Sequence, residues 1–533
     1  MTETTISLPF VTSTRLFERQ QWISYYESRL HDQLKWAASY IQSHEDQPSE
    51  VIRHLNSFAT LLHQARRYPS MYPLALTLIS ALHPWPARWG YWDMWKTEVL
   101  FAIRAATQLG RLDLQAKFQA YLADILFQTG KFHEAVENAK QAVYIARNDG
   151  ALDPLLSAAE TSINALRALG LAQQADDGLE EFQNIAVEIV ANEKTVPWKR
   201  AEVMARIAWL QMGSAYGKEH TADALMTIAQ AIAFLETSPF VEPAILASIY
   251  NLRGVVLWRQ DEYAQAVQHI KKALDLFSQQ GDVFSQASLS GNLGIVYWSM
   301  GEFTEAENVL HHCINITEKL NAHARLLKAI RVLAAVYLAR GQLQKALRYC
   351  ERHLELALEL NEPFEISGAT ANRGSIRLHL HKYDAARRDL EAELAVDGDK
   401  THVGVGCSYA NLSRCYAGLG QREYGLELAK KAWNLAEING SARLQIVALR
   451  CMAEYQSPAK NKELLHEALI LTQKHARPFD QAACLLVLAH LSNNEAERFT
   501  LWQQGVNLLK QMGATAWLRG HSITNPPCLP LIV

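Results

Sequence analysis

The stretch NLGIVYWSMGEFTEA, residues 292–306, predicts two helices that meet at a short turn. Gly294 and Ala306 are small enough to let these two helices approach closely. Phe303 is one of the large residues that fill the space beside this contact. Gly301 falls where the first helix must end, at a position that favours a positive φ angle. The stretch therefore predicts a helical hairpin.

The same pattern recurs along the chain at a constant interval. Its alanine is found at Ala266, Ala306, Ala346 and Ala386. Its small residue, twelve positions earlier, is found at Gly254, Gly294, Ala334 and Gly374. Further copies occur upstream in residues 115–150 and downstream in residues 406–438, where Gly425 replaces the alanine. Such a repeat predicts an all-α array in which each helix pair packs mainly against its neighbours.

This arrangement of small and large residues resembles the tetratricopeptide repeat, in a form longer than the usual repeat of that family. The resemblance implies a right-handed superhelical α-solenoid of antiparallel helix pairs, with a concave groove lined by the first helix of each pair. We expect about ten helix pairs in residues 98–516. An N-terminal helical cap region is expected at residues 1–97, and a flexible tail broken by prolines at residues 517–533.

Two further stretches carry a second resemblance. Residues 91–135 (YWDMWKTEVLFAIRAATQLGRLDLQAKFQAYLADILFQTGKFHEA) and residues 508–518 (LLKQMGATAWL) are similar to the sensor half of bacterial signal-transduction ATPases of the STAND type. They are also similar to the corresponding half of large transcriptional activators of the LuxR type. The sequence contains neither the nucleotide-binding switch nor the DNA-binding domain of those proteins. We therefore expect a freestanding recognition module in bacterial regulation.

The amino-acid composition limits which kinds of partner the protein is expected to bind and where in the cell it is expected to lie. A net charge of -3, with 49% apolar and 20% charged residues, gives no electrostatic bias toward nucleic acid. No apolar run approaches the roughly 20 residues that a membrane-spanning helix needs. The first ten residues lack the basic charge and apolar run of a signal peptide. The seven cysteines show no disulfide or zinc spacing, so we expect reduced thiols in a cytoplasmic protein.

The sequence also lacks the usual catalytic motifs. There is no GxxxxGK[ST] loop, and the two HExx stretches, at residues 133 and 466, lack the second histidine of a zinc protease. The stretch QAAC that ends at Cys484 lacks the glycine that follows a caspase nucleophile. We expect no enzymatic activity, no cofactor and no metal site. A hidden hydrolase would need a cluster of polar residues that the sequence does not show.

In the register of the resembled family, one face of each first helix points into the groove. Asparagines recur on this face at Asn251, Asn292, Asn372 and Asn411. A side-chain amide offers one donor and one acceptor to the backbone of an extended peptide, which suits capture of a partner segment. The alternative is that each asparagine bonds only to the neighbouring repeat.

Two tryptophans and three basic residues complete the predicted groove. Trp258 and Trp298 lie one repeat apart, and aromatic anchors often dominate binding energies. The alternative for this pair is packing against an adjacent turn. Lys328, Arg331 and Arg414 add positive charge, which favours an acidic or carboxylate-bearing peptide.

Four tryptophans cluster outside the repeat register, at Trp85, Trp89, Trp92 and Trp95. They indicate either a cluster that closes the end of the solenoid or an exposed docking patch. The function predicted from the whole sequence is a non-catalytic scaffold or adaptor that binds a peptide or partner segment in its groove. The alternative is a sensor whose superhelix changes shape when a small ligand or signal peptide binds.

Overall fold

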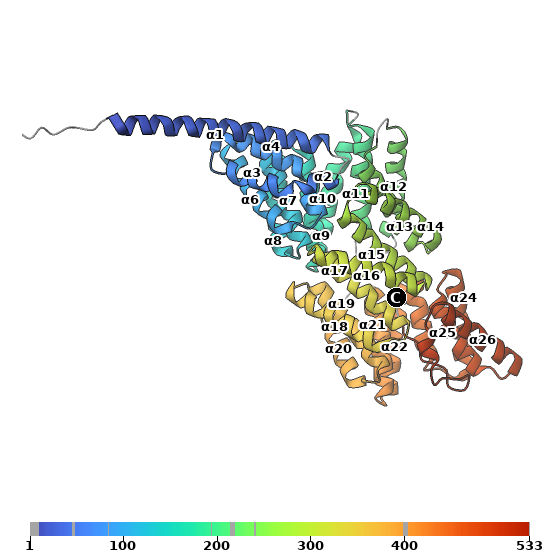
Figure 1. Ribbon diagram of the computed structural model, residues 1–533. Coiled ribbons are helices and arrows are strands. Elements are labelled where there is room, and N and C mark those ends of the chain that lie inside the picture. Colours follow the sequence, from blue (N-terminus) through green and yellow to red (C-terminus); the bar gives the residue numbers. More distant parts are fainter. Residues whose placement is uncertain are drawn as a thin grey trace, which may run out of the picture. The chain divides into compact units, whose positions relative to one another are not determined.

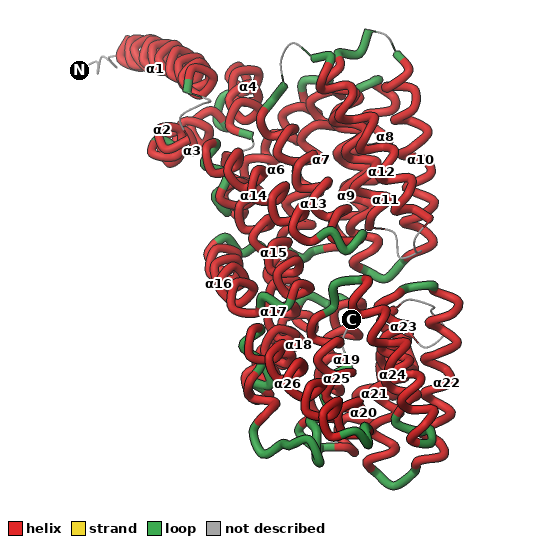
Figure 2. The backbone as a smooth tube through the Cα atoms, turned by 90° about the vertical axis from the view of Figure 1, so that its right-hand side faces the viewer, coloured by secondary structure: helices red, strands yellow, loops and turns green. Residues whose placement is uncertain are grey.

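The computed structural model describes residues 10–44, 48–83, 85–192, 194–213, 219–238, 241–397 and 403–531. Throughout these ranges the secondary structure is helical, as Figure 2 shows. The only β feature in them is an isolated bridge between Ser522 and Asn525. No helix in the same ranges is both long and apolar enough to cross a bilayer. The predicted all-α class is confirmed.

The helices follow one another along the chain and are joined by short turns (Figure 1). The first ten are α1 (Phe10–Ser43), α2 (Pro48–Arg53), α3 (Leu55–Ala65), α4 (Tyr72–Leu82), α5 (Trp85–Arg88), α6 (Trp92–Gln108), α7 (Leu112–Gln128), α8 (Phe132–Asp149), α9 (Leu152–Ala168) and α10 (Ala172–Ala191). The next eight are α11 (Pro197–Gly213), α12 (Glu219–Glu236), α13 (Pro243–Arg259), α14 (Tyr263–Gln279), α15 (Val283–Met300), α16 (Phe303–Lys319), α17 (His323–Ala339) and α18 (Leu343–Glu359). The last eight are α19 (Pro363–His379), α20 (Tyr383–Asp397), α21 (Val403–Gly418), α22 (Arg422–Asn439), α23 (Ala442–Ala453), α24 (Pro458–Lys474), α25 (Pro478–Leu491) and α26 (Glu495–Gln511). Short 3-10 helices span Pro69–Met71 and Thr515–Leu518.

The turns recur at half the period of the sequence repeat. Residues with positive φ are evenly spaced in the central part of the chain, at Asp261, Gly281, Gly301, Asn321, Gly341, Asn361 and His381. Glycine, asparagine and aspartate are the residues that best tolerate this conformation. At Gly301 the turn is closed by a hydrogen bond from the Glu302 N–H to the Tyr297 carbonyl oxygen, 2.9 Å away. Helices α16 to α19 all have 17 residues, so successive helices match in length.

The predicted close contact within each helix pair is present. A Cβ atom added to Gly294 would lie 2.5 Å from Cδ2 and 2.6 Å from Cγ of Leu310, which is fully buried. The same clash would arise between Gly254 and Ile270, at 2.5 Å. Glycine therefore lets α15 rest directly on α16, and α13 on α14, one repeat apart.

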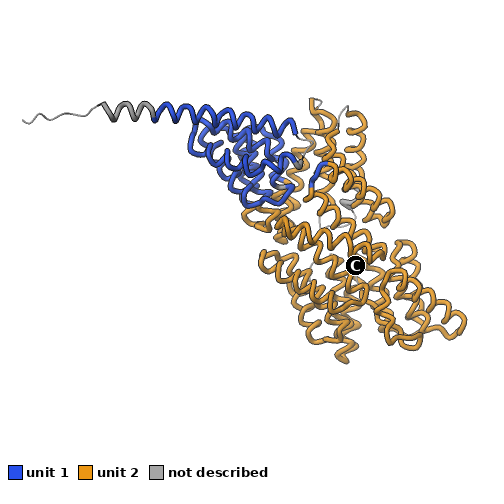
Figure 3. Tube along the Cα trace, viewed as in Figure 1, with its two compact units in different colours: residues 1–125, 137–159, 280–282 blue, residues 126–136, 160–279, 283–533 orange. Residues whose placement is uncertain are grey.

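The chain divides into two compact units, shown in Figure 3. Unit 1 comprises residues 1–125, 137–159 and 280–282, and unit 2 comprises residues 126–136, 160–279 and 283–533. Unit 1 therefore extends past residue 97, the expected end of the cap region.

Most of the N-terminal tryptophan cluster is buried inside unit 1. Trp85, Trp92 and Trp95 are 4%, 3% and 1% exposed. Trp89 is half-buried. This burial favours the packing interpretation of the cluster over an exposed docking patch.

Within unit 2 the last helices pack back against earlier turns. The indole Nε1 of Trp517 donates a hydrogen bond to the Ala339 carbonyl oxygen, 2.9 Å away. His475 Nδ1 lies 2.9 Å from Asp261 Oδ2, although the two residues are far apart in the sequence. In the segment expected to be a loose tail, residues 519–522, 524 and 525 are exposed, but Leu529 and Leu531 are buried, at 2% and 0% exposed. Its prolines prevent helix formation, but the leucines on either side of Pro530 are buried within unit 2.

We predict that Gly294→Ala lowers the free energy of unfolding by about 1–3 kcal/mol, because the new methyl group would overlap the buried Leu310 side chain. The matched control is Gly291→Ala in the same helix. Its methyl group would lie 3.6 Å from Cys313 Sγ, an ordinary contact, and alanine is the better helix former. Urea titrations followed by circular dichroism should show destabilisation by the first change only. Equal midpoints for the two variants would contradict the close contact.

Candidate functional site

A cavity of about 430 Å³ lies on the first helices of successive pairs in unit 2. Its walls come from α13, α15, α17, α19 and α21, together with α20, α23 and the C-terminal segment. Five of the nine predicted groove residues line it: Trp258, Trp298, Arg331, Asn372 and Asn411. The structure thus brings residues from five consecutive first helices to one cavity.

Several polar atoms of the lining residues lack a partner. Asn411 Oδ1, Ser375 Oγ and Trp298 Nε1 are buried and make no hydrogen bond within the part of the chain that the structure describes. Asn411 is only 4% exposed and Ser375 only 5%. The Asn372 amide, which is half-buried, also has no partner there. Unpaired buried polar groups are costly, so these atoms offer hydrogen-bonding capacity to a ligand.

Three other predicted residues bond to one another across repeats. The Asn292 amide nitrogen donates to Asn251 Oδ1, and Lys328 Nζ donates to Asn292 Oδ1, both at 2.9 Å. Asn292 is 6% exposed. Burial, and then the nearby charges of Arg325 and Arg331, lower the pKa of Lys328 to about 8. Asn251 and Asn292 therefore bond to neighbouring repeats, which is the alternative to binding a peptide.

The two predicted tryptophans are half-buried on the cavity wall. Trp258 donates a hydrogen bond to Ser299 Oγ at 2.8 Å. The Arg443 guanidinium lies 4.7 Å from the centre of the Trp258 ring. Trp298 packs against the hydrophobic core of the central repeats. Each tryptophan therefore combines packing within the protein with a surface that faces the cavity.

The predicted positive wall is largely neutralised by carboxylates. Arg331 Nε lies 3.6 Å from Glu365 Oε2, which is also 2.9 Å from His353 Nε2. Burial alone would raise the pKa of Glu365, but Arg331 and His353 outweigh it and hold this pKa at about 2. Arg414 forms an ion pair with Glu454. The expected preference for an acidic peptide therefore loses its main support, because these cations already have anionic partners.

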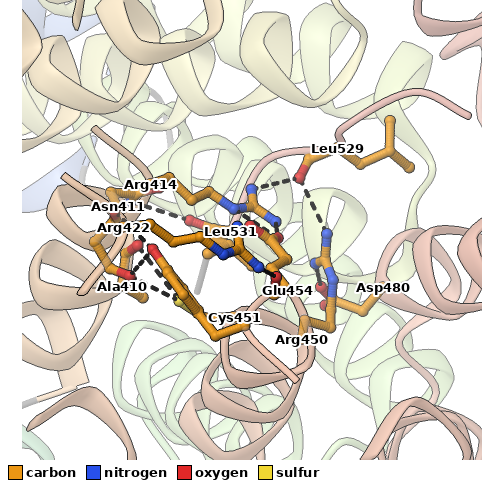
Figure 4. Close-up of polar contacts among 12 residues, drawn as sticks. Ala410, Asn411, Arg414, Arg422, Arg450, Cys451, Glu454, Asp480, Leu529 and Leu531 are labelled. Atoms are coloured by element: carbon orange, nitrogen blue, oxygen red, sulfur yellow. Dashed lines mark hydrogen bonds and ion pairs between the residues drawn. The ribbon is translucent and has the colours of Figure 1, made fainter. Parts of the chain in front are cut away.

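Arg414 and Asn411 contact the chain's own C-terminal segment, as Figure 4 shows. Arg414 Nη1 donates to the Leu529 carbonyl oxygen at 2.9 Å, and Asn411 Nδ2 donates to that of Leu531 at 3.4 Å. Arg450 Nη2 donates to the same Leu529 oxygen at 3.1 Å. These predicted groove residues do bind extended backbone, but the backbone belongs to the same chain.

Most of the lining residues were not predicted from the sequence, and three of them, Arg443, Leu531 and Gly368, matter for the argument. Arg443 and Leu531 reach it through the return of the last helices, and no local pattern marks them. Gly368 lines the cavity from α19, and a Cβ atom added there would meet no atom within 4 Å. The sequence signal for this open position was Gly368 itself, because a glycine within a helix and outside the repeat pattern often has a packing or functional reason.

Thiol and metal chemistry find little support among the residues that the structure covers. All seven cysteines lie in the described ranges and are free. Burial raises the pKa of Cys484, the caspase-like candidate, to about 12, so its thiol stays protonated near neutral pH. No group of three or more His, Cys, Asp or Glu side chains in those ranges is placed to hold a metal ion.

We predict that Asn292→Ala destabilises the fold by about 1–3 kcal/mol, because it leaves Lys328 and Asn251 without their partner. Asn372→Ala is the matched control. It removes an amide that has no such bonds, so its effect should stay within about 0.5 kcal/mol. Thermal unfolding of the two variants, measured side by side, checks this difference. Similar losses would show that the two asparagines do not differ in role.

The buried carboxyl of Glu362 predicts a pH effect. Burial, and then the charge of Glu365, raise the pKa of Glu362 to about 8. Between about pH 4.5 and pH 8 the unfolded chain releases a proton that the folded chain keeps, so this group makes stability fall as pH rises. Glu362→Gln should therefore raise the melting temperature more at pH 8 than at pH 5.

Glu365→Gln provides the opposite control for the same measurement. The pKa of Glu365 is lowered, so its contribution to stability is present above its unfolded pKa and is lost as pH falls toward 2. This variant should lower the melting temperature at pH 8. Parallel pH profiles for the two variants would contradict both assignments.

Comparison with known proteins identifies the repeat. Models of the tetratricopeptide repeat match residues 245–319, 285–359 and 116–149. The Tonsoku-like protein of Danio rerio is 28% identical over 214 residues. That match covers 37% of this chain, and the chain spans only 15% of the relative's length.

Solved structures with similar folds include a Rap protein complexed with competence and sporulation factor. It has a TM-score of 0.54 at 15% identity, over 67% of this chain and 98% of that protein. A STAND protein with a tetratricopeptide repeat sensor from Pyrococcus horikoshii gives a TM-score of 0.38 at 16% identity, over 72% of this chain and 53% of that one. The likeness to the Rap protein is one of fold alone. By the repeat models and the fold together, the chain contains tetratricopeptide repeats within an all-α array of helix pairs.

Proposed function

We propose that this chain binds an extended peptide, or a segment of a partner protein, in the cavity of unit 2 and acts as a non-catalytic scaffold or adaptor. The observation that carries the proposal is a set of buried polar atoms on Asn411, Ser375 and Trp298, around an open volume of about 430 Å³, that have no partner among the residues the structure describes. A peptide backbone supplies both donors and acceptors at the spacing of successive residues. The cytoplasm as its location, and a role in bacterial regulation, are parts of this proposal.

The lining indicates the chemistry of the ligand. Phe364 is 47% exposed and shares the wall with Trp258 and Trp298, so apolar side chains have surfaces to pack on. Arg331 is paired with Glu365, so a charged side chain on the ligand would have to compete with an existing ion pair. The proposed ligand is therefore a peptide recognised through its backbone and apolar side chains. The Rap protein of the same fold was solved with a bound factor, which supports a binding role without naming the ligand here.

A sensor is the second candidate, and one set of contacts favours it. Asp261 pairs with His475 at 2.9 Å and lies 3.6 Å from Arg443, which links early and late repeats of unit 2. Arg443 also stacks on Trp258, and both residues line the cavity. A ligand that separates Arg443 from Trp258 would also strain the link to Asp261. Small-angle scattering with and without ligand distinguishes the candidates, since only the sensor requires a change in the radius of gyration.

Gly368 provides the sharpest test of the binding site. Gly368→Trp should fill part of the cavity and weaken peptide binding at least tenfold, because a side chain at this position starts in open space and takes volume that the ligand would use. Gly368→Ala, which adds only one methyl group, is the matched control and should bind as the wild type does. The ligand for this test is the tightest binder selected from a random peptide display library on the purified chain.

Asn372→Ala provides a second test with the same peptide. Loss of one hydrogen bond of about 0.5–1.5 kcal/mol corresponds to binding roughly 2- to 10-fold weaker. Fluorescence anisotropy gives the dissociation constants for all variants. Unchanged affinity in both Gly368→Trp and Asn372→Ala would place the binding site elsewhere.

A further inference from the structure

The segment Pro526–Leu531, with the sequence PPCLPL, has no regular secondary structure and lies against α21 and α23. It is held through two carbonyl oxygens. The Leu529 oxygen accepts from Arg414 and Arg450 at 2.9 and 3.1 Å. The Leu531 oxygen accepts from Asn411 at 3.4 Å and from the Cys407 thiol at 3.3 Å. Figure 4 shows the two arginines reaching the segment from neighbouring helices.

The composition of the segment suits hydrogen bonding in which the segment only accepts, through its carbonyl oxygens. Three of its six residues are proline, which has a carbonyl oxygen but no N–H. The helices supply donors only, from Arg414, Arg450, Asn411 and Cys407. Proline also limits the conformations of the free segment, so less entropy is lost when it binds. These are the features of a bound proline-rich peptide.

The two arginines are held in place independently of the segment. Arg414 Nε donates to Glu454 Oε1 at 2.9 Å, and Arg450 forms a buried ion pair with Asp480. Because these carboxylates orient the guanidinium groups, the donors would stay in position if the segment left. The binding surface is therefore preorganised for a carbonyl oxygen, whichever chain provides it.

The fit between the segment and this surface is incomplete. A cavity of about 180 Å³ remains beside Pro526, Pro527, Cys528 and Leu529. This cavity is partly open to solvent, so the segment does not fill the surface on which it lies. On the other side, Leu531 forms part of the wall of the 430 Å³ cavity. The segment thus lines both cavities, the smaller through Pro526, Pro527, Cys528 and Leu529 and the larger through Leu531.

Asn411 shows that the segment leaves a bonding site unused. Its Nδ2 donates to Leu531, while its Oδ1 has no partner within the described residues and the side chain is 4% exposed. A ligand with an N–H at this point would satisfy the acceptor. A partner peptide with an N–H at this point can therefore make a hydrogen bond that the chain's own segment does not make.

We propose that Pro526–Leu531 is an intramolecular ligand that closes one end of the binding groove, and that an extended, apolar, proline-containing peptide displaces it. The inference rests on the proposed function for the role of a foreign peptide, and on the contacts above for the segment itself. Displacement frees the donors of Arg414, Arg450 and Asn411 and removes the part of the wall that the segment supplies to each cavity.

The test uses the full chain with Leu529→Glu and Leu531→Glu, which replace two buried side chains and release the segment. The probe is a fluorescent synthetic peptide with the sequence of residues 522–531, kept under reducing conditions. We expect it to bind the released variant at least tenfold more tightly than the wild-type chain, whose site is occupied. Adding Arg414→Ala and Arg450→Ala to the released variant should abolish binding. A peptide with both leucines changed to glutamate should not bind.

Equal binding, or no binding, of the probe to wild type and to a folded released variant overturns the inference. Hydrogen exchange on the unmodified chain provides a second measurement that does not depend on the variant. The amides of Leu529 and Leu531 should exchange at least roughly 100-fold faster than the core amides of α21, because the segment opens without unfolding the helices. Equal protection would mean that the segment is a fixed part of the core and would also overturn the inference.

The outcomes separate this inference from the proposed function. If the chain's own peptide binds the released variant but no library peptide binds any form, the intramolecular ligand stands and the proposed function fails. If a library peptide binds wild type and released variant equally, the proposed function stands and the intramolecular ligand fails.

Discussion

The contact of Gly294 with Leu310 sets the geometry on which the rest of unit 2 depends. A missing Cβ atom lets α15 lie on α16, and the same contact recurs at Gly254 with Ile270. Where the small residue is Ala334 instead, the residue sixteen positions later is Cys350, which is smaller than leucine. A larger residue at the first position is therefore accompanied by a smaller residue at the second, so that both fit at the helix crossing. Equal helix lengths and evenly spaced turns then repeat the crossing along the array.

Each first helix packs closely against the second helix of its pair, and its opposite face is not needed for that contact. In the central repeats that face carries two kinds of polar residue. Asn292 bonds to Asn251 and Lys328 and so ties neighbouring repeats together. Asn372 and Asn411 face the cavity instead. Asparagine at the same position of the repeat thus links neighbouring repeats in one part of the array and lines the cavity in another. The difference depends on whether the next repeat offers a side chain with which it can bond.

The fold could be predicted from the sequence because its signals are local. The glycines at Gly254, Gly294 and Gly374 and the turn at Gly301 depend on residues in the same helix pair. The site was only partly predictable, because it is completed by contacts across long separations. Arg443 reaches Trp258, and His475 reaches Asp261, through a return of the chain that no repeat pattern encodes. The pairing of Arg331 with Glu365 likewise changes the expected charge of the wall.

The C-terminal segment shows why one sequence signal supports opposite interpretations. Prolines at Pro526, Pro527 and Pro530 rule out a helix, and the sequence therefore predicts a loose tail. The missing N–H groups that prevent helix formation also leave carbonyl oxygens as the main bonding groups of the segment. The segment therefore has more hydrogen-bond acceptors than donors in its main chain. A surface rich in donors, such as the one formed by Arg414 and Arg450, complements this surplus of acceptors. Order in the segment thus comes from the groove, and the groove that orders it is equally suited to another chain of the same kind.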